Sequence, residues 1–205
     1  MNINPIIQTN AGGTFGISWD GLQQGVAMPD PETRFALSGG VLDVAETVPV
    51  WGGVGISENV PANPVVNVAS SGGRIAIATN LTGGSTAKTL TGFSVFDQAY
   101  GMVNTPQSPV PLASGGMQVM FYRLGSMARI ALKMDPTLAA SLYNNPISTP
   151  VSWDFTNQQL IAFAVTAVPV KVLKVYPSGC MTVNYAAGTG FATWNYNGAC
   201  ALVMI

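Results

Sequence analysis

The chain has 205 residues and a mass of 21.3 kDa, enough for one large domain or two small ones. Hydrophobic residues make up 48% of it and charged residues only 8%, against roughly 25% charged in an ordinary soluble domain. Disordered chains are poor in apolar residues and rich in charge, so this composition excludes disorder. The charged residues are too few to cover a free monomer, and we expect neighbouring chains to cover much of the surface.

Residue types that are absent or scarce narrow the chemistry. The chain has no histidine, which excludes Ser-His-Asp and Cys-His catalysis and every metal site that needs imidazole. Cys180 and Cys200 are too few for a disulfide framework or a four-thiolate metal site. They either pair with each other or are two small buried apolar residues, and we favour the second interpretation.

Two further patterns bear on location. The N-terminus has no basic region followed by an apolar stretch, so we expect no secretory signal. The longest nearly apolar run, residues 160–170, is too short to cross a bilayer as a helix. We therefore expect a chain that is not exported and has no membrane partner.

The net charge of −1 conceals an asymmetry along the chain. Residues 1–73 carry six acids and one base, whereas residues 74–205 carry seven bases and three acids. Segments of opposite charge favour head-to-tail or arm-to-neighbour contacts between chains. The alternative explanation of the asymmetry is that a few charges are segregated by chance. The bases are dispersed and are not interleaved with aromatic residues, so we expect no nucleic-acid partner.

The first 60 residues show little alternation of apolar and polar side chains. We predict that residues 1–60 form an extended N-terminal arm and that residues 61–205 form a β-rich body. A short helix over residues 30–39 interrupts the arm, with Asp30 as its N-cap, Pro31 at the first helical position and a Gly pair at its end. A second helix with the same Asp-Pro start is predicted from Asp135 to Tyr143.

Short runs typical of strands, separated by glycine pairs and prolines, follow along the body; examples are residues 74–78, 93–96 and 117–123. This pattern predicts an all-β fold: an antiparallel sandwich, jelly-roll-like, or a small barrel, with the extended arm and two short helices. Residues 150–205 are expected to form an antiparallel meander. In it, Pro177–Gly179 and Gly188–Gly190 are predicted turns, and Asn197-Gly198 is a predicted two-residue hairpin turn.

No group of residues indicates catalysis. Ser18 lacks the G-x-S-x-G spacing and a histidine base. Asp30 and Glu32 could suggest a glycosidase pair, but helix capping explains both. Three further carboxylates are isolated in the sequence: Asp20, Asp43 and Asp154. The tryptophans could form a sugar-stacking platform, contacts between subunits, or parts of the core; they are Trp19, Trp51, Trp153 and Trp194. We predict no enzyme and no catalytic, cofactor-binding or metal-binding residue.

Several longer phrases resemble virion structural proteins of tailed bacteriophages, most closely head decoration (cement) proteins. They are Met28–Gly40 with Pro49–Val54, Phe121–Ser126, Val151–Leu160, and Pro169 through Asn195 to the terminus. The resemblance spans most of the chain, and these phrases carry no catalytic meaning. It implies a β-rich, non-enzymatic protein that binds the outer surface of the expanded capsid shell as a symmetric oligomer.

The expected partners are therefore the major capsid protein and further copies of this chain, and the expected location is the virion, assembled in the host cytoplasm. A tail, adaptor or fibre-base component of the virion has the same composition and remains an alternative. A carbohydrate-binding or depolymerase module is the rival from another class; it requires convergent carboxylates in an aromatic-lined cleft, a pattern that the sequence does not support.

Overall fold

The computed structural model describes residues 21–28, 30–59, 74–82, 88–96, 103–105, 108–145 and 149–205. This part of the chain is all-β, with two short helices, α2 (Pro31–Arg34) and α3 (Pro136–Leu142). Asp30 and Asp135 cap the two helices as expected, accepting hydrogen bonds from the amides of Glu32 (3.1 Å) and Leu138 (3.0 Å). The all-β class, the small-barrel alternative and the two short helices are thus confirmed.

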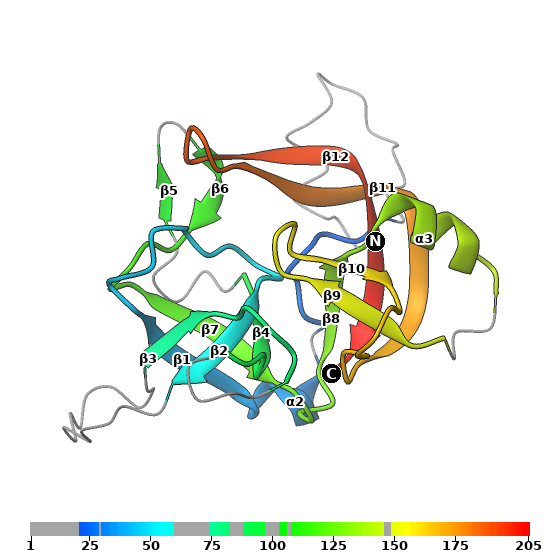
Figure 1. Ribbon diagram of the computed structural model, residues 1–205, viewed down its shortest axis with the longest axis horizontal. Helices are drawn as coiled ribbons and strands as arrows, with labels where there is room; N and C mark the ends of the chain where they lie inside the picture. Colours follow the sequence, from blue (N-terminus) through cyan, green and yellow to red (C-terminus); the bar gives the residue numbers. More distant parts are fainter. Residues whose placement is uncertain are drawn as a thin grey trace.

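Five strands close into a small barrel on one side of the molecule (Figure 1). In barrel order they are β1 (Leu37–Leu42), β3 (Arg74–Ile77), β2 (Gly55–Asn59), β4 (Gly92–Ser94) and β7 (Gln118–Arg123). β1 and β3 run parallel, and all other neighbours are antiparallel. Closure leaves no unpaired sheet edge in this part of the fold.

The predicted arm is wrong for residues 37–59, because β1 and β2 are barrel strands. The central residues of β1 are Gly39 and Gly40, which carry no side chain and hide the alternation by which a strand is recognised. Glycine at position 39 leaves room for the neighbouring strand, because a Cβ on Gly39 would lie 2.9 Å from Gln118 Nε2 of β7. Residues 1–20 of the predicted arm lie outside the described residues.

The other side of the molecule contains a three-stranded sheet and a hairpin beside it (Figure 1). The sheet has the order β11 (Lys171–Ala186), β12 (Phe191–Met204) and β8 (Arg129–Lys133). β9 (Val151–Asp154) and β10 (Gln159–Ala162) form the neighbouring hairpin. A further pair, β5 (Val103–Thr105) and β6 (Ser108–Leu112), lies near the far end of β11 and β12.

The C-terminal region is one long bent hairpin rather than a meander of short strands. β11 is continuous through the predicted turn at Pro177–Gly179, and β12 is continuous through the one at Asn197-Gly198. The predicted turn at Gly188–Gly190 is confirmed, because the chain reverses at residues 187–190. Asn197-Gly198 lies inside β12, with Gly198 opposite Cys180. A type I′ turn needs positive φ at both residues, and the positive φ angles of this hairpin belong to Gly179 and Gly190 instead.

The expected turn at Pro177–Gly179 is a β-bulge. Three residues of β11 lie there opposite one residue of β12, between the pairs Tyr176–Cys200 and Cys180–Gly198. Extra residues in one strand bend a ladder and increase its twist. The hairpin accordingly turns a corner, so that its lower half pairs with β8 and its upper half reaches over the barrel toward β6 (Figure 1).

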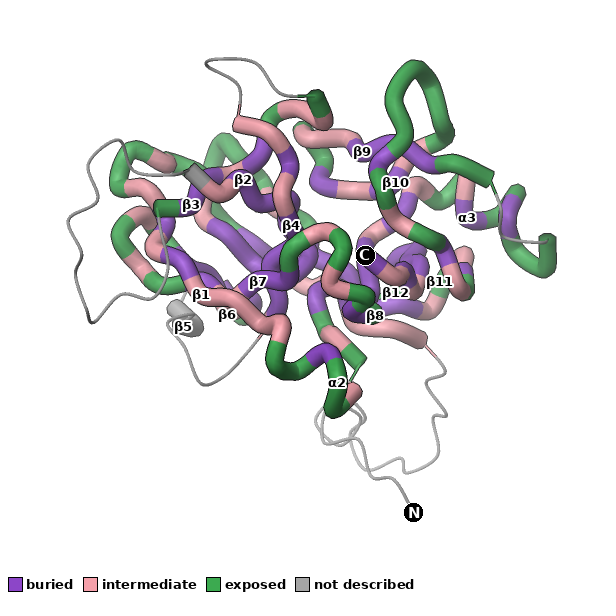
Figure 2. Tube along the Cα trace, turned by 90° about the horizontal axis from the view of Figure 1, so that it is seen from below, coloured by how far each residue is buried: buried purple, intermediate pink, exposed green. Residues whose placement is uncertain are grey.

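Alternation along the barrel strands divides the interior into two apolar clusters. Phe121 of β7 belongs to one cluster with Leu42, Ile56 and Ile75, whereas its neighbour Tyr122 belongs to the other. The second cluster joins the outer face of the barrel to the three-stranded sheet; its members include Phe93, Ile130, Leu132, Trp153, Leu160 and Val203. Figure 2 shows the buried stretches concentrated along β7, β8 and β12, with exposed residues in α2 and the outer loops.

Residues 21–28 connect the barrel to the sheet. The amide of Gln24 donates to Met181 O of β11 (2.8 Å), and the amide of Gly25 donates to Ala131 O of β8 (2.7 Å). Gly25 O accepts from the amide of Phe96, which follows barrel strand β4 (2.9 Å). An added Cβ on Gly25 would lie only 2.2 Å from the carbonyl carbon of Gly52, so glycine is needed for this close approach.

Candidate functional site

The predicted carboxylate pair has a structural role. Asp30 caps α2 and also accepts from the Arg129 guanidinium (Oδ2 to Nη2, 3.0 Å). The Asp30 carboxylate therefore links the helix to β8, and Glu32 lies exposed in the first helical turn. The capping interpretation is confirmed.

The other predicted carboxylates stabilise loops. Asp43 Oδ1 accepts from the amide of Ala45 (3.0 Å). Asp154 accepts from the amide of Thr156 (2.8 Å) and from the side chain of Asn157 (2.7 Å). Burial acts to raise the pKa of Asp154, but these hydrogen bonds outweigh it and hold the pKa below its ordinary value. Asp20 and Ser18 lie outside the described residues.

The tryptophans do not form one platform. Trp51 is buried against Tyr185 (ring centroids 5.2 Å apart), and Trp153 is buried against Phe93 (4.9 Å). Trp194 packs on Phe96 and donates from Nε1 to Pro109 O (3.2 Å). The three side chains stabilise separate contacts between elements, and Trp19 lies outside the described residues.

The charge asymmetry is partly neutralised within the chain. Three ion pairs join described residues, and each connects an acid before residue 74 with a base after it; they are Lys88–Glu46, Arg123–Glu58 and Arg129–Asp30. Arg123 binds both carboxylate oxygens of Glu58, at 2.6 and 2.8 Å. At least three of the six acids in residues 1–73 therefore have partners in the same molecule.

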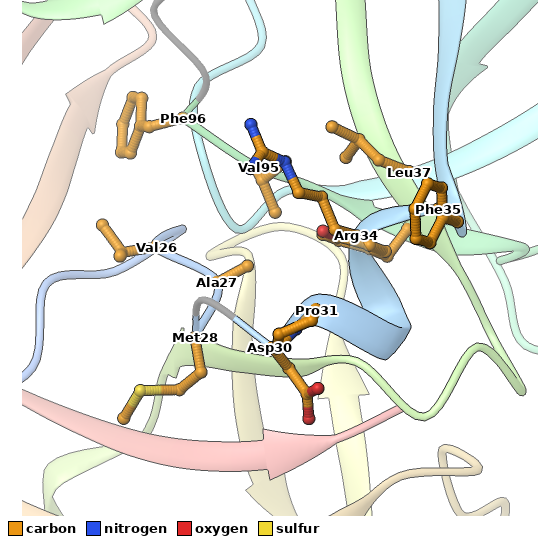
Figure 3. Close-up of a pocket in the computed structure, with 11 residues that line it drawn as sticks. Val26, Ala27, Met28, Asp30, Pro31, Arg34, Phe35, Leu37, Val95 and Phe96 are labelled. Atoms are coloured by element: carbon orange, nitrogen blue, oxygen red, sulfur yellow. The ribbon is translucent and has the colours of Figure 1, made fainter.

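The feature that stands out is an apolar groove beside α2, with a volume of about 490 Å³ (Figure 3). We call it the α2 groove. Eleven residues line it: Val26, Ala27, Met28, Asp30, Pro31, Arg34, Phe35, Leu37, Val95, Phe96 and Tyr122. They come from residues 26–28 of the connecting segment, from α2 and its two caps, from barrel strands β1 and β7, and from residues 95–96, which follow β4. The groove thus lies where the two halves of the fold meet.

Large apolar side chains of the α2 groove are exposed to solvent. Phe35, the C-cap of α2, is 93% exposed, and Val26 and Met28 are 41% and 40% exposed. In Figure 3, Val26, Ala27 and Met28 lie on one side of the groove, and Phe35 and Leu37 lie on the other. An isolated exposed apolar residue is ordinary, but several around one hollow are typical of an interaction surface.

The polar groups of the groove are few. The Arg34 side chain extends toward Val95 and Phe96, and the Asp30 carboxylate points the other way (Figure 3). Asp30 is already engaged by Arg129. The lining therefore offers an apolar surface with one cation at its centre. Such a surface suits binding to another protein and provides no nucleophile with an adjacent base.

Sequence reasoning missed this groove. Val26, Met28 and Phe35 are visible as apolar residues around the Asp30-Pro31 start of the helix. Their exposure depends on the arrangement of α2 against the barrel, which no local pattern encodes. Cys180 and Cys200 are free and buried, so the favoured interpretation of two small buried residues is confirmed. The register of β11 and β12 also makes the two cysteines diagonal neighbours, which no sequence pattern indicates.

The chain matches no known family model, no curated protein and no solved structure. In the part of the chain that the structure describes, no helix is long and apolar enough to span a membrane. Within the same residues, no three side chains of the Asp, Glu and Cys type gather as metal ligands.

Proposed function

We propose that this chain is a non-enzymatic structural protein of a virion that binds and stabilises the mature capsid shell as a decoration (cement) protein. Its partners are the major capsid protein and further copies of itself. The resemblance of its sequence phrases to tailed-phage head proteins suggests the class, and the surface of the folded chain supports it.

The observation that carries the proposal is the exposed apolar surface of the α2 groove on a chain with so few charges. The chain exposes 11367 Å² of accessible surface and has 8 basic and 9 acidic residues, which leaves roughly one charged residue for every 670 Å². Three acids and three bases among these are already paired within the chain. Such a surface is poorly suited to a free monomer and well suited to a place among other subunits.

The mechanism of a cement protein is mass action. A protein that binds the mature lattice, and not its dissociated subunits, stabilises the lattice by its binding free energy at each copy. The rigid barrel and the bent hairpin preorganise the binding surface, so little conformational entropy is lost on binding. No chemical step is needed.

The copy number of the chain in purified particles, relative to the major shell protein, tests the proposal. A ratio of the same order as the shell protein supports a lattice-covering protein. A few copies per particle would assign the chain to the portal vertex, the tail or a fibre base. Absence from particles would overturn the virion proposal, and glycan binding would be tested next.

A variant pair tests the part played by the α2 groove. Phe35→Asp places a charge in the groove without disturbing the core, because Phe35 is 93% exposed. Phe163→Asp is the matched control: Phe163 is also exposed (48%) and follows β10, which lies away from α2 in Figure 2. We expect Phe35→Asp to weaken binding to particles that lack the protein at least tenfold. Equal binding of the two variants would contradict a role for the groove.

A further inference from the structure

The corner of the long hairpin holds the chain's two cysteines side by side. Cys180 lies opposite Gly198, and Cys200 lies two residues further along β12, opposite Tyr176. Both residues are therefore on the same face of the ladder, on either side of the bulge at Pro177–Gly179. Both thiols are free and buried, and Cys180 Sγ donates to Ser178 O (4.0 Å).

The two cysteines are diagonal neighbours across the ladder. In a regular antiparallel ladder, diagonal neighbours are about 7–8 Å apart, slightly beyond the Cα separation of about 4.4–6.8 Å that a disulfide requires. The extra residues of β11 bend the ladder between Tyr176 and Cys180. Closing a disulfide therefore draws the two strands together at a point where the ladder is already bent.

We propose that Cys180 and Cys200 form a redox-active dithiol, and that its oxidation to an intramolecular disulfide locks the corner of the β11–β12 hairpin. The oxidant is a small disulfide of the glutathione class. The proposal does not depend on the function proposed above, since it concerns only the chemistry of this pair.

The surroundings favour attack by Cys180. A hydrogen bond from Cys200 lowers the pKa of Cys180 to about 7, assisted by the Leu22 amide, so a substantial fraction is thiolate at neutral pH. The pKa of Cys200 is raised by the same hydrogen bond and by burial. Lys133, opposite Cys200 on β8, favours the Cys200 thiolate electrostatically and donates to Val183 O (3.2 Å).

The reaction is a two-step thiol–disulfide exchange. The Cys180 thiolate attacks one sulfur of the glutathione disulfide, which forms a mixed disulfide and releases one glutathione thiolate. Cys200 loses its proton and attacks the Cys180 sulfur, which releases the second glutathione. In total the two protein thiols lose two electrons and two protons, and one glutathione disulfide becomes two thiols.

Access to the pair is controlled by the connecting segment. Leu22 O accepts from the amide of Met181, the residue after Cys180 (2.9 Å). Gly21 lies so close to Gly179 that an added Cβ would be 2.0 Å from its carbonyl oxygen. Residues 21–24 must therefore separate locally from β11 before glutathione reaches the sulfur, which makes the exchange slow and couples it to this contact.

The test is to equilibrate the full chain in glutathione buffers of stepped potential, starting from both reduced and oxidised protein. After acid quenching, an alkylating reagent and intact mass report the state of each cysteine. We expect one two-electron transition to a species that has lost two hydrogen masses and takes up no alkyl group. The oxidised protein should melt roughly 5–10 °C higher than the reduced protein.

The single variants provide the matched controls. Cys180→Ser and Cys200→Ser should each lose the transition and the rise in melting temperature. Two alkylated cysteines at every potential, a glutathione adduct as the final product, or a disulfide between two chains would each overturn the proposal. These readouts come from the wild-type chain, so they decide the question even if a serine variant does not fold.

Discussion

The barrel and the C-terminal hairpin are built in opposite ways. In the barrel, β1 pairs with β7, so that Leu37 lies opposite Tyr122 although they are far apart in the sequence. In the hairpin, β11 and β12 are joined by residues 187–190 and pair along almost their whole length. The barrel thus depends on contacts between distant segments, whereas the hairpin depends on contacts between neighbours in the chain.

This difference explains where the two regions are vulnerable. A hairpin of neighbours loses little chain entropy when it closes, but distant segments must all be ordered before the barrel closes. Residues 21–28 and the shared cluster around Phe93 hold the two regions together. Substitutions at that junction should therefore have larger effects than substitutions in the hairpin or at surface ion pairs.

The largest effect is expected for Gly25→Val. Gly25 has a φ of 76°, and an added Cβ would overlap the Gly52 backbone at 2.2 Å. Strain and overlap together should lower the free energy of unfolding by about 4–6 kcal/mol. Gly125→Val is the control, because Gly125 has a φ of 84° with open space around it and should cost only the strain, about 1–3 kcal/mol. Equal losses by urea denaturation would contradict a tight junction at Gly25.

The second-largest loss of stability is expected for Phe93→Ala. Phe93 is fully buried and packs edge-on against Trp153 of β9, so its removal leaves a cavity between barrel and sheet. A loss of about 3–5 kcal/mol is expected. The same substitution at Phe35, which is 93% exposed, should change stability by less than about 0.5 kcal/mol. Two separate thermal transitions in Phe93→Ala would show that the regions fold independently.

Gly198→Val tests the continuous β12. A Cβ there would lie 2.1 Å from Thr182 Oγ1, so we expect a loss of about 1–3 kcal/mol. Adding Thr182→Ala to this variant removes the two atoms nearest to the new Cβ, Oγ1 and Cγ2 of Thr182, and should restore part of the lost stability. If Asn197-Gly198 were a turn, Thr182→Ala would restore nothing. Gly188→Val, in the actual turn with open space around it, should have little effect on the melting temperature.

The smallest effect is expected for Glu58→Gln. The hydrogen bond from Arg123 lowers the pKa of Glu58 below 4.5, and Arg123 also donates to Ser38 Oγ of β1 (2.8 Å). A lowered folded-state pKa stabilises the fold above about pH 4.5, and this stabilisation is lost as the pH falls through the folded-state value. Because both side chains remain in contact with solvent, with Arg123 52% and Glu58 25% exposed, the loss should be below about 1 kcal/mol at pH 7. Denaturation midpoints of the two proteins should converge at low pH; a constant difference would contradict the mechanism.

The features predicted from sequence are those that short stretches of chain determine. Asp30-Pro31 and Asp135-Pro136 begin helices because the Asp side chain caps and Pro is preorganised at the first position. The strand-forming runs predicted an all-β chain. The helix predicted over residues 30–39 is shorter than expected, ending at Arg34, because β1 begins at Leu37.

The errors have one physical cause. Pro177–Gly179 and Asn197-Gly198 are typical turn sequences, yet β11 and β12 pair on both sides of them. Next to these segments, β8 pairs with β12 from Cys200 on, and the Gln24 amide donates to Met181 O. Gly39-Gly40 is a poor strand sequence, yet it is in β1 because it pairs with Met120 and Val119 of β7. In each case contacts from distant segments outweighed the local preference.

The sequence by itself determined the all-β class, the two helix starts and the scarcity of charge, because each follows from residue types and their near neighbours. The tertiary structure alone decided which acids pair with which bases, that apolar residues of α2 and residues 26–28 surround one exposed groove, and that Cys180 and Cys200 are diagonal neighbours in one ladder. These contacts depend on barrel closure and on the bend of the hairpin, and both arise from the simultaneous packing of segments that no local pattern connects.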